Sequence, residues 1–184
     1  YDACPAQPAK FPRHRRAPSR GPLQESERYT VDRIDKRILD CLQEDSTLSI
    51  AQIAERVGLS TTPCWRRINN LERAGVIRSR VTLLDREHLN LGVDVFVAIR
   101  TNQHTTAWLE QFAQAVSGFP EVVEFYRMSG DIDYLMRVVV PDIAAYDRFY
   151  RRLIEKVDIA DVSSSFAMER IKYTTALPLD YIVD

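Results

Sequence analysis

The stretch Ser49–Ile77, SIAQIAERVGLSTTPCWRRINNLERAGVI, predicts two short helices joined by a glycine turn. Ser49 and Gln52 have the spacing of a capping box at the start of the first helix. Gly58 can adopt the left-handed backbone that ends a helix, and Ser60 can cap the helix that follows. The stretch is therefore typical of a helix-turn-helix unit.

The second of these helices has an apolar face and a polar face. Cys64, Ile68 and Leu71 share the apolar face, which predicts that they pack into a core. The opposite face carries hydroxyl, amide and guanidinium groups, contributed by Thr62, Arg66, Asn69, Asn70 and Arg73. Such a helix, presented by a tight turn, meets the requirements for reading the major groove, and we predict DNA binding. The alternative is a small helical subdomain whose arginines only face solvent.

The flanking sequence supplies the remaining parts of a winged helix-turn-helix domain over residues 29–84. Asp32 is expected to cap an upstream helix with an apolar stripe, which provides the third helix of a core. Downstream, Val76-Ile77 and Val81–Leu84 flank Arg78 and Arg80, and we expect them to form a short hairpin-like wing.

Charge is distributed unevenly along the 184 residues, although the net charge is only −1. Residues 29–84 carry nine Lys or Arg and seven Asp or Glu, whereas residues 92–184 carry nine and fourteen. This asymmetry suits one part that approaches phosphate and another that repels it. Because the positive balance is mild, affinity for DNA is expected to depend on presenting two or more heads together.

Residues 1–28 are rich in Pro, Arg and Ala without periodicity, and we predict that they are disordered. They are either a native basic arm or an artefact of expression or of the assigned start of translation, and we assign them no function. No apolar run approaches the roughly 20 residues of a membrane span, and no secretory signal is evident, so a cytoplasmic location is expected.

The three cysteines, Cys4, Cys41 and Cys64, are odd in number and lack CxxC spacing. Neither a disulfide framework nor a zinc site is indicated. Cys41 and Cys64 fall on apolar helix stripes, and we expect both to be small core residues.

After a linker at residues 85–92, residues 93–184 alternate between strand and helix patterns. Strands are predicted at Val93–Arg100, Val122–Met128, Tyr134–Val140 and, as a long final strand, Val162–Tyr173, with helices at Thr105–Ser117 and from Pro141-Asp142 onward. The order βαββαβ predicts a ferredoxin-like antiparallel sheet with both helices on one face, so the whole chain belongs to the α+β class. The other face has no cover within the chain, which predicts a two-fold homodimer matched to a palindromic DNA site.

Two signatures, in the right order and spacing, resemble the Lrp/AsnC ("feast/famine") transcriptional regulators. They are Leu71-Glu72-Arg73-Ala74-Gly75-Val76-Ile77 in the head and Ser129-Gly130-Asp131-Ile132-Asp133-Tyr134 in the second domain, which is of the RAM type in this family. The resemblance implies a transcription factor that assembles as dimers and as octamers of four dimers. Amino acids bind between the dimers and alter assembly or DNA affinity.

Two branches of that family remain open. Thr61-Thr62-Pro63-Cys64-Trp65 and Ser164-Ser165-Phe166-Ala167-Met168 look most like the activators of cysteine detoxification, which makes cysteine a candidate effector. The C-terminal stretch is also similar to regulators of branched-chain amino-acid and keto-acid catabolism.

Carried onto this chain, the resemblance implies a DNA-binding surface on the helix Ser60–Gly75 and on the wing. Arg66 and Asn70 are the candidates for contacts with base edges, whereas Arg67 and Arg73 are expected to contact phosphate or to form local ion pairs. Trp65 is expected to pack against the first helix rather than to stack. The full predicted set is Ser60, Thr61, Thr62, Arg66, Arg67, Asn70, Arg73, Arg78 and Arg80.

The same resemblance implies an effector site at the turn Gly130-Asp131. An amino acid has both a carboxylate and an ammonium group, so its site needs exposed backbone N–H donors and nearby acceptors. The predicted set is Met128, Ser129, Gly130, Asp131, Asp133 and Tyr134, with Ser163 and Ser164 from the last strand. The alternative is a plain β-turn in which Asp caps its own backbone.

An enzyme and a protein of the same fold that does not regulate genes are the two alternative classes. Asp131 and Asp133 could hold a metal ion or act as an acid–base pair, but His14, His88 and His104 are all distant in sequence, and no phosphate loop or nucleophile motif is present. We therefore predict that the protein is not an enzyme and uses no cofactor or metal. A free-standing amino-acid sensor leaves the arginine-bearing helix unexplained, whereas an architectural DNA-binding protein of the same fold remains open.

Overall fold

The computed structural model describes residues 29–103, 105–157 and 159–182, which divide into two compact units. The first unit, the head, comprises the described residues up to Arg80 together with the segment from Ala176 onward. The second unit, the sheet domain, extends from Val81 to Thr175. The disorder predicted for residues 1–28 lies outside the described residues, as do Cys4, His14 and His104.

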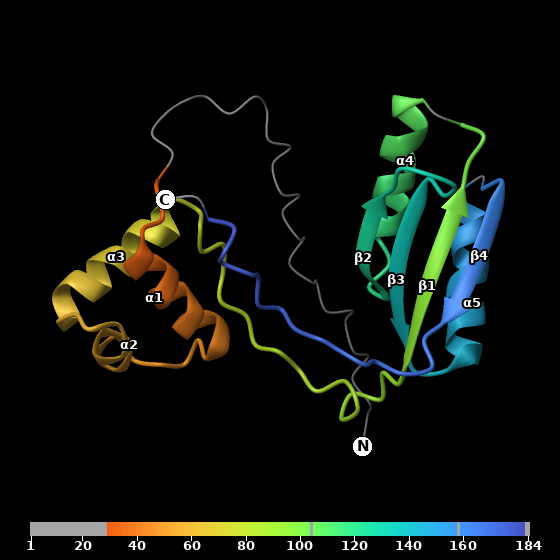
Figure 1. Ribbon diagram of the computed structural model, residues 1–184. Coiled ribbons are helices and arrows are strands. Elements are labelled where there is room, and N and C mark those ends of the chain that lie inside the picture. Colours follow the sequence, from red (N-terminus) through yellow and green to blue (C-terminus); the bar gives the residue numbers. More distant parts are fainter. Residues whose placement is uncertain (1–28, 104, 158, 183–184) are drawn as a thin grey trace, which may run out of the picture. The chain divides into compact units, whose positions relative to one another are not determined.

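The head consists of three helices, α1 (Arg33–Glu44), α2 (Ile50–Val57) and α3 (Thr61–Arg73) (Figure 1). The Asp32 side chain caps α1, and Ser49 and Gln52 form the predicted capping box at the start of α2. Gly58 ends α2 with the left-handed φ of 77° that its sequence position predicts. Ser60 occupies the cap position of α3, although its side chain makes no capping hydrogen bond. The predicted helix-turn-helix is confirmed.

The apolar faces of the three helices meet in one small core. Ile38, Ile53 and Leu71, one from each helix, are fully buried there. Cys64 is also fully buried and Cys41 is half-buried, so both are the core residues that the sequence predicted, and both thiols are free. Burial raises the pKa of the Cys64 thiol, which keeps it protonated.

The hairpin-like wing expected over residues 76–84 is not formed. The N–H groups of Val76 and Ile77 both donate to the Leu71 carbonyl, at 3.0 and 3.1 Å, and residues 78–84 are irregular. The apolar side chains of this segment find no surface to cover, since Val81 and Leu84 are 69% and 70% exposed. A two-stranded ribbon without such packing is only marginally stable in water, which accounts for the difference.

The head also includes the end of the chain, which the sequence pattern did not indicate. The Gln43 side-chain amide donates to the Leu177 carbonyl at 3.1 Å and accepts from the Leu177 N–H at 2.7 Å. Lys36 Nζ donates to the Ile182 carbonyl at 2.8 Å. The side chains of Leu179 and Ile182 pack against the head core. The final segment is therefore a structural part of the head.

The sheet domain has the predicted βαββαβ order. Its elements are β1 (Val93–Arg100), α4 (Thr106–Ser117), β2 (Val122–Arg127), β3 (Tyr134–Val140), α5 (Ile143–Lys156) and β4 (Asp161–Phe166). The strands are antiparallel in the order β2-β3-β1-β4, and both helices cover one face (Figure 1). The ferredoxin-like α+β prediction is confirmed.

The last strand is shorter than predicted. We expected it to extend to Tyr173, but β4 ends at Phe166, which is paired with Val95 near the beginning of β1. Only one further ladder contact follows, from the Ala167 N–H to the Asp94 carbonyl at 3.0 Å. Because β1 begins at Val93, none of the described strands pairs with the chain beyond this point.

The core of the sheet domain lies between the sheet and its two helices. Val95, Val97 and Ile99 of β1 are fully buried, and so are Phe112 of α4 and Phe149 of α5. Because successive side chains of a strand point to opposite faces, the intervening residues of β1 lie on the face that no helix covers, where Phe96 is exposed and Asp94 is buried.

Asp94 is the centre of an ion cluster in this domain. It is only 7% exposed and accepts hydrogen bonds from Arg86, from Arg137 at 3.1 Å and from Arg170 at 3.1 Å. Burial opposes ionisation of Asp94, but the three guanidinium groups outweigh it and lower the carboxyl pKa below its ordinary value. Arg86 precedes β1 and Arg170 follows β4, so one carboxylate anchors the segments that enter and leave the sheet.

Candidate DNA-binding surface and effector turn

The outward face of α3 carries exposed hydroxyl, indole and guanidinium groups. Ser60, Thr61, Thr62 and Arg66 are all exposed, and none of the described residues provides a side-chain partner for the Arg66 guanidinium. Trp65 was expected to pack against the first helix, but 56% of its surface is exposed, so that expectation is wrong. The apolar positions of α3 are already filled by the smaller buried residues, which leaves the indole on the outer rim.

Arg67 points away from this face, although it is the neighbour of Arg66. Its Nη1 atom lies 2.8 Å from an oxygen of Asp35, which is 1% exposed, and 2.7 Å from an oxygen of Asp32. Tyr29 also donates to Asp35, at 3.0 Å. The hydrogen bonds that Arg67 donates to Asp35 and Asp32 raise the pKa of its guanidinium group above the ordinary value. Arg67 therefore ties α3 to the start of α1, which is the local ion pairing that the sequence offered as one of its two roles.

The last turn of α3 forms a second local network. Arg73 donates to the side-chain oxygen of Asn70 at 2.5 Å and to the Asn69 carbonyl at 3.4 Å. Arg80 pairs with Glu72 at 3.0 Å, whereas Arg78 is exposed and has no such pair among the described residues. Asn70 thus keeps its amide N–H groups for an outside acceptor, with its oxygen held by Arg73.

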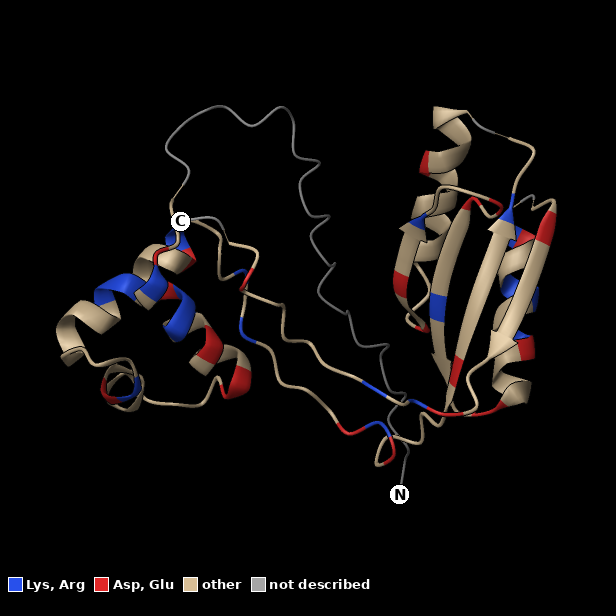
Figure 2. Cartoon of the chain, in the orientation of Figure 1, with Lys and Arg blue, Asp and Glu red and all other residues tan. Residues whose placement is uncertain are grey.

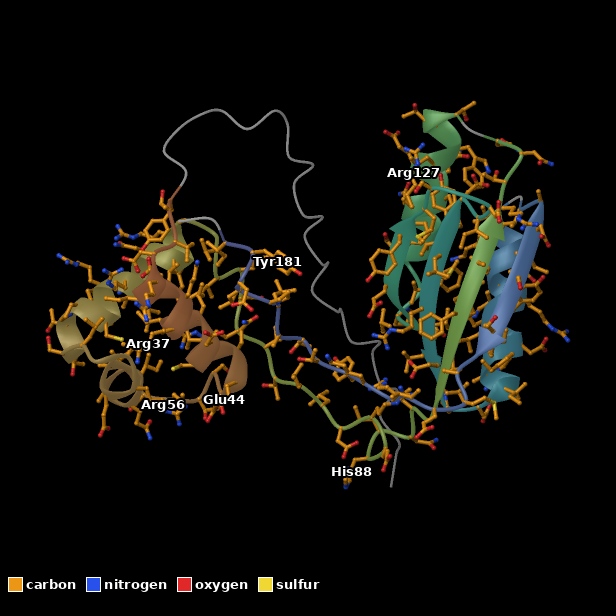
Figure 3. The ribbon with its side chains drawn as sticks, viewed as in Figure 1. Arg37, Glu44, Arg56, His88, Arg127 and Tyr181 are labelled. Carbon is orange, nitrogen blue, oxygen red and sulfur yellow. The ribbon has the colours of Figure 1, made fainter. Side chains whose placement is uncertain are left out.

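The turn between α2 and α3 is held by contacts that the sequence reasoning did not find. Arg37 of α1 donates to the carbonyls of Val57, at 3.1 Å, and Arg56, at 2.6 Å, at the end of α2. Arg56 in turn lies 3.5 Å from Glu44, and Figure 3 labels these side chains in the head. A cation at a helix C-terminus is favourable because it meets unsatisfied carbonyls. Arg37 and Arg56 thus fix the helix pair that presents α3.

The predicted effector turn joins β2 to β3 and is closely bonded to the end of β1. The Met128 N–H donates to the Asp133 carbonyl at 2.8 Å, and the Asp133 carboxylate accepts from the Thr101 N–H at 2.8 Å. Arg100 Nε donates to the Asp131 carbonyl at 2.7 Å. Gly130 has a φ of 118°, a conformation that other residues rarely adopt. The turn is therefore a preorganised loop with Ser129, Gly130 and Asp131 exposed.

A small pocket of about 160 Å³ lies beside this turn. Met128, Asp133 and Tyr134 of the predicted set line it, and sequence reasoning missed its other lining residues, Thr105, Thr106, Leu109 and Arg127. Figure 3 shows Arg127 at the end of the sheet domain where α4 begins. The order of the elements could have indicated these residues, because antiparallel pairing places the end of β1, the end of β2 and the start of β3 at the same end of the sheet.

Ser163 and Ser164 are not brought to this turn within one chain. Both lie on β4, which is the edge strand opposite β2. Ser163 is exposed, and Ser164 forms a short hydrogen bond with the Tyr146 hydroxyl of α5. Their assignment to the effector site stays a prediction that requires a second chain.

The described residues were also compared for charge, for helices that could span a membrane and for clusters of metal-binding side chains. Figure 2 shows basic positions along α3 and α5 among acidic ones elsewhere. None of the described helices is long and apolar enough to span a membrane. Across the described part of the chain, no group of three or more His, Cys, Asp or Glu side chains could hold a metal ion.

A three-helix head that presents a polar recognition helix, together with a ferredoxin-like domain, defines a class of two-domain DNA-binding regulators. Residues 31–78 match the family described as winged helix-turn-helix DNA-binding, and residues 94–177 match the Lrp/AsnC ligand binding domain. The chain belongs to the Lrp/AsnC family of transcriptional regulators, and it is a DNA-binding regulator rather than an enzyme.

Relatives and solved structures agree with that assignment. The chain is 50% identical to the glutamate uptake regulatory protein of Zymomonas mobilis, with 81% of this chain and 91% of the relative covered. It is also 50% identical to the DNA-binding transcriptional activator DecR of Escherichia coli, with 82% and 99% covered. An AsnC family regulator from Agrobacterium tumefaciens is 66% identical, with 83% and 99% covered and a TM-score of 0.81. A Neisseria meningitidis regulator, solved as an L-Met complex, is 36% identical, with 84% and 100% covered and a TM-score of 0.80.

Proposed function

We propose that this regulator binds a palindromic operator in cytoplasmic DNA as a homodimer, and that a small amino acid modulates its assembly or its DNA affinity. The proposal rests on the difference between two neighbouring arginines of α3, Arg66 and Arg67. Arg67 forms ion pairs inside the head, whereas Arg66 is exposed and has no side-chain partner among the described residues. An unpaired guanidinium on an exposed helix is available for a bidentate contact with a guanine edge.

The other outward groups divide by the atoms they leave free. Asn70 retains amide N–H donors for a base edge, because its oxygen is held by Arg73. Ser60, Thr61 and Thr62 surround the N-terminus of α3, where hydroxyl groups and backbone N–H groups suit phosphate. Arg78 and Arg80 follow α3 and are assigned to the DNA backbone. Arg67 acts indirectly in this scheme, by holding α3 against α1.

A dimer through the uncovered sheet face is supported by the residues on that face. Phe96 and Tyr126 are 40% and 50% exposed there, and Leu135 and Val139 lie on the same face in register with β1. Apolar side chains gathered on one face favour burial against a second copy. Sedimentation velocity of the purified protein tests this step: we expect a dimer or an octamer of four dimers, and a stable monomer at all concentrations contradicts it.

The effector is assigned to the turn 128–133 and its adjoining pocket. The exposed backbone of the Gly130 turn can meet a carboxylate, and the Asp133 carboxylate is close to where an ammonium group would lie. The Neisseria relative bound to L-Met supports an amino acid as the ligand class. The branch resemblance puts cysteine first among the candidates. Glutamate follows, because one relative is named as a glutamate uptake regulatory protein, and the branched-chain amino acids come next.

The DNA-binding step is tested by fluorescence anisotropy on the promoter of the protein's own gene and on random duplex. We expect Arg66→Ala to weaken operator binding by about 1–3 kcal/mol, with little effect on random DNA. Equal losses on both duplexes would reduce Arg66 to a phosphate contact. Binding sites spread evenly over the genome in a footprinting experiment would favour an architectural role over gene regulation.

The effector step is tested by thermal-shift measurements with each amino acid, and then by repeating the DNA titration with the one that stabilises the protein. Gly130→Val forces a β-branched residue into a φ of 118°, a strain of roughly 1–3 kcal/mol that reshapes the turn. We expect this variant to remain a dimer and to lose the amino-acid response. A full response in Gly130→Val would exclude the turn from the effector site.

A further inference from the structure

A second hollow in the sheet domain, the α5 pocket, lies far from the effector turn. It has a volume of about 540 Å³, and Val140, Pro141 and Ala145 give it an apolar floor. This volume falls within the range of roughly 300–1,000 Å³ that is usual for small-molecule sites. The pocket lies at the end of β3, whereas the effector turn lies at its start. With a rise of about 3.3 Å per residue, the strand separates the two by roughly 20 Å.

Three arginines of α5 surround this floor, and they differ in how firmly they are paired. Arg152 is engaged, because it lies 2.5 Å from Glu121 and its guanidinium carbon is 5.4 Å from the centre of the Phe119 ring. Arg151 pairs only with Asp147, one turn earlier on the same helix, at 3.0 Å. Both of these side chains are more than half exposed, and such pairs contribute little. Among the described residues, no carboxylate lies within ion-pair distance of Arg148.

Two guanidinium groups over an apolar floor therefore remain available for an outside anion. Planar guanidinium groups bind carboxylate or phosphate through paired hydrogen bonds, and the floor accommodates a short carbon skeleton. Glu121, on the rim of the pocket, accepts a hydrogen bond from Arg152 through its Oε1 atom. Its other oxygen, Oε2, is buried without a hydrogen-bond partner among the described residues, but the lining carries three arginines and one carboxylate, so its net charge is positive.

The surroundings favour a small anion over a nucleic acid. Residues 81–175, the sheet domain, carry ten Lys or Arg and fourteen Asp or Glu, so the domain as a whole repels a long polyanion. A small ligand instead responds to the local charge within the pocket. Figure 2 shows that α5 carries both basic and acidic positions, and that both kinds also lie on the strands of the domain.

We propose that the α5 pocket is a second ligand site, which binds a small organic anion with two acidic groups on a short carbon skeleton. Arg148 and Arg151 hold the acidic groups, and the apolar floor contacts the carbon chain. A dicarboxylate and a phosphate-bearing carboxylate share this chemistry. The site is separate from the proposed amino-acid site and does not depend on it.

Isothermal titration calorimetry of the full-length protein tests the proposal with three probes, glutarate, 3-phosphoglycerate and acetate. We expect measurable binding of glutarate or of 3-phosphoglycerate, each of which has two acidic groups, and none of acetate, which has only one. Arg148→Gln and Arg151→Gln should each weaken that binding about tenfold, because each removes a charge-assisted hydrogen-bonding pair. Lys172→Gln is the matched control, since it removes one positive charge from an exposed position of the same domain outside the pocket.

The outcomes separate this site from its alternatives. Binding that survives Gly130→Val but falls in Arg148→Gln supports the α5 pocket, whatever the fate of the amino-acid response. Equal weakening in Lys172→Gln reduces the effect to general charge and overturns the proposal. If neither glutarate nor 3-phosphoglycerate binds, the proposal is overturned too. Weaker binding of random duplex in Arg148→Gln would then reassign these arginines to DNA. Circular dichroism of each variant confirms that the fold is retained.

Discussion

Arg66 and Arg67 are adjacent in sequence, yet their replacement by alanine should have opposite consequences. In Arg67→Ala, the Asp35 carboxylate, which is 1% exposed, loses the guanidinium at 2.8 Å, and Asp32 loses its partner at 2.7 Å. Removing one partner of a fully buried ion pair costs about 3–5 kcal/mol. Here the Arg67 side chain is 27% exposed and Tyr29 still donates to Asp35, so we expect a loss of about 2–3 kcal/mol.

Urea-induced unfolding followed by circular dichroism measures that loss. Arg66→Ala is the matched control, because the same substitution one position earlier removes an exposed, unpaired side chain and should change the free energy of unfolding by less than about 0.5 kcal/mol. Under conditions in which both variants are folded, operator binding should fall more in Arg66→Ala than in Arg67→Ala. An unchanged free energy of unfolding in Arg67→Ala, together with a loss of DNA affinity equal to that of Arg66→Ala, would refute the assignment of Arg67 to the interior.

Three further outcomes are expected. Asp94→Asn should destabilise the sheet domain by roughly 3–4 kcal/mol in urea unfolding, because three arginines lose their shared carboxylate; a change below about 1 kcal/mol would contradict the cluster's importance. The pKa of Asp94 and that of Asp32 are lowered in the folded protein, so the stability they contribute is complete above the ordinary carboxyl pKa of 3.8 and is lost as pH falls through the lower folded value. In Asp94→Asn, the free energy of unfolding should therefore depend less steeply on pH in that range. Leu179→Ala should weaken hydrogen-exchange protection in α1 by about 1–2 kcal/mol, because the Leu179 side chain packs against the head core. Leu177→Ala is the control and should leave the protection unchanged, because the Leu177 side chain is 72% exposed. Equal effects of the two substitutions would argue against packing of the last segment on the head.

Local signals in the sequence were sufficient for most of the secondary structure. The Asp32 cap, the Ser49–Gln52 capping box and the left-handed Gly58 each depend on residues within one turn of each other, and all three are present. The β1 and β3 boundaries were also predicted correctly, because alternating burial is written into the residues themselves. The order of elements then restricted the second domain to a ferredoxin-like sheet.

Contacts between residues distant in sequence explain where the predictions fell short. The wing and the long final strand both read as β-structure, but a strand needs a neighbour, and residues 78–84 and 168–173 have none. The periodicity of the sequence places Trp65 between the two faces of its helix, and only the tertiary structure shows that its side chain lies outside the head core. Only some of the residues that line the effector pocket were predicted, because others, such as Thr105, come from elements distant in sequence from the turn.

The amino-acid sequence alone determined which segments are helices and strands, how they are capped, and that one helix carries groups suited to DNA. These properties follow from side-chain periodicity and backbone preference, which act over a few residues. Tertiary structure alone decided that Arg67 faces Asp35 while Arg66 stays free, that the last residues join the head, and that three arginines gather around an apolar floor on α5. Each of these features depends on contacts between residues that are distant in sequence, and a pattern that extends over a few residues does not specify such contacts.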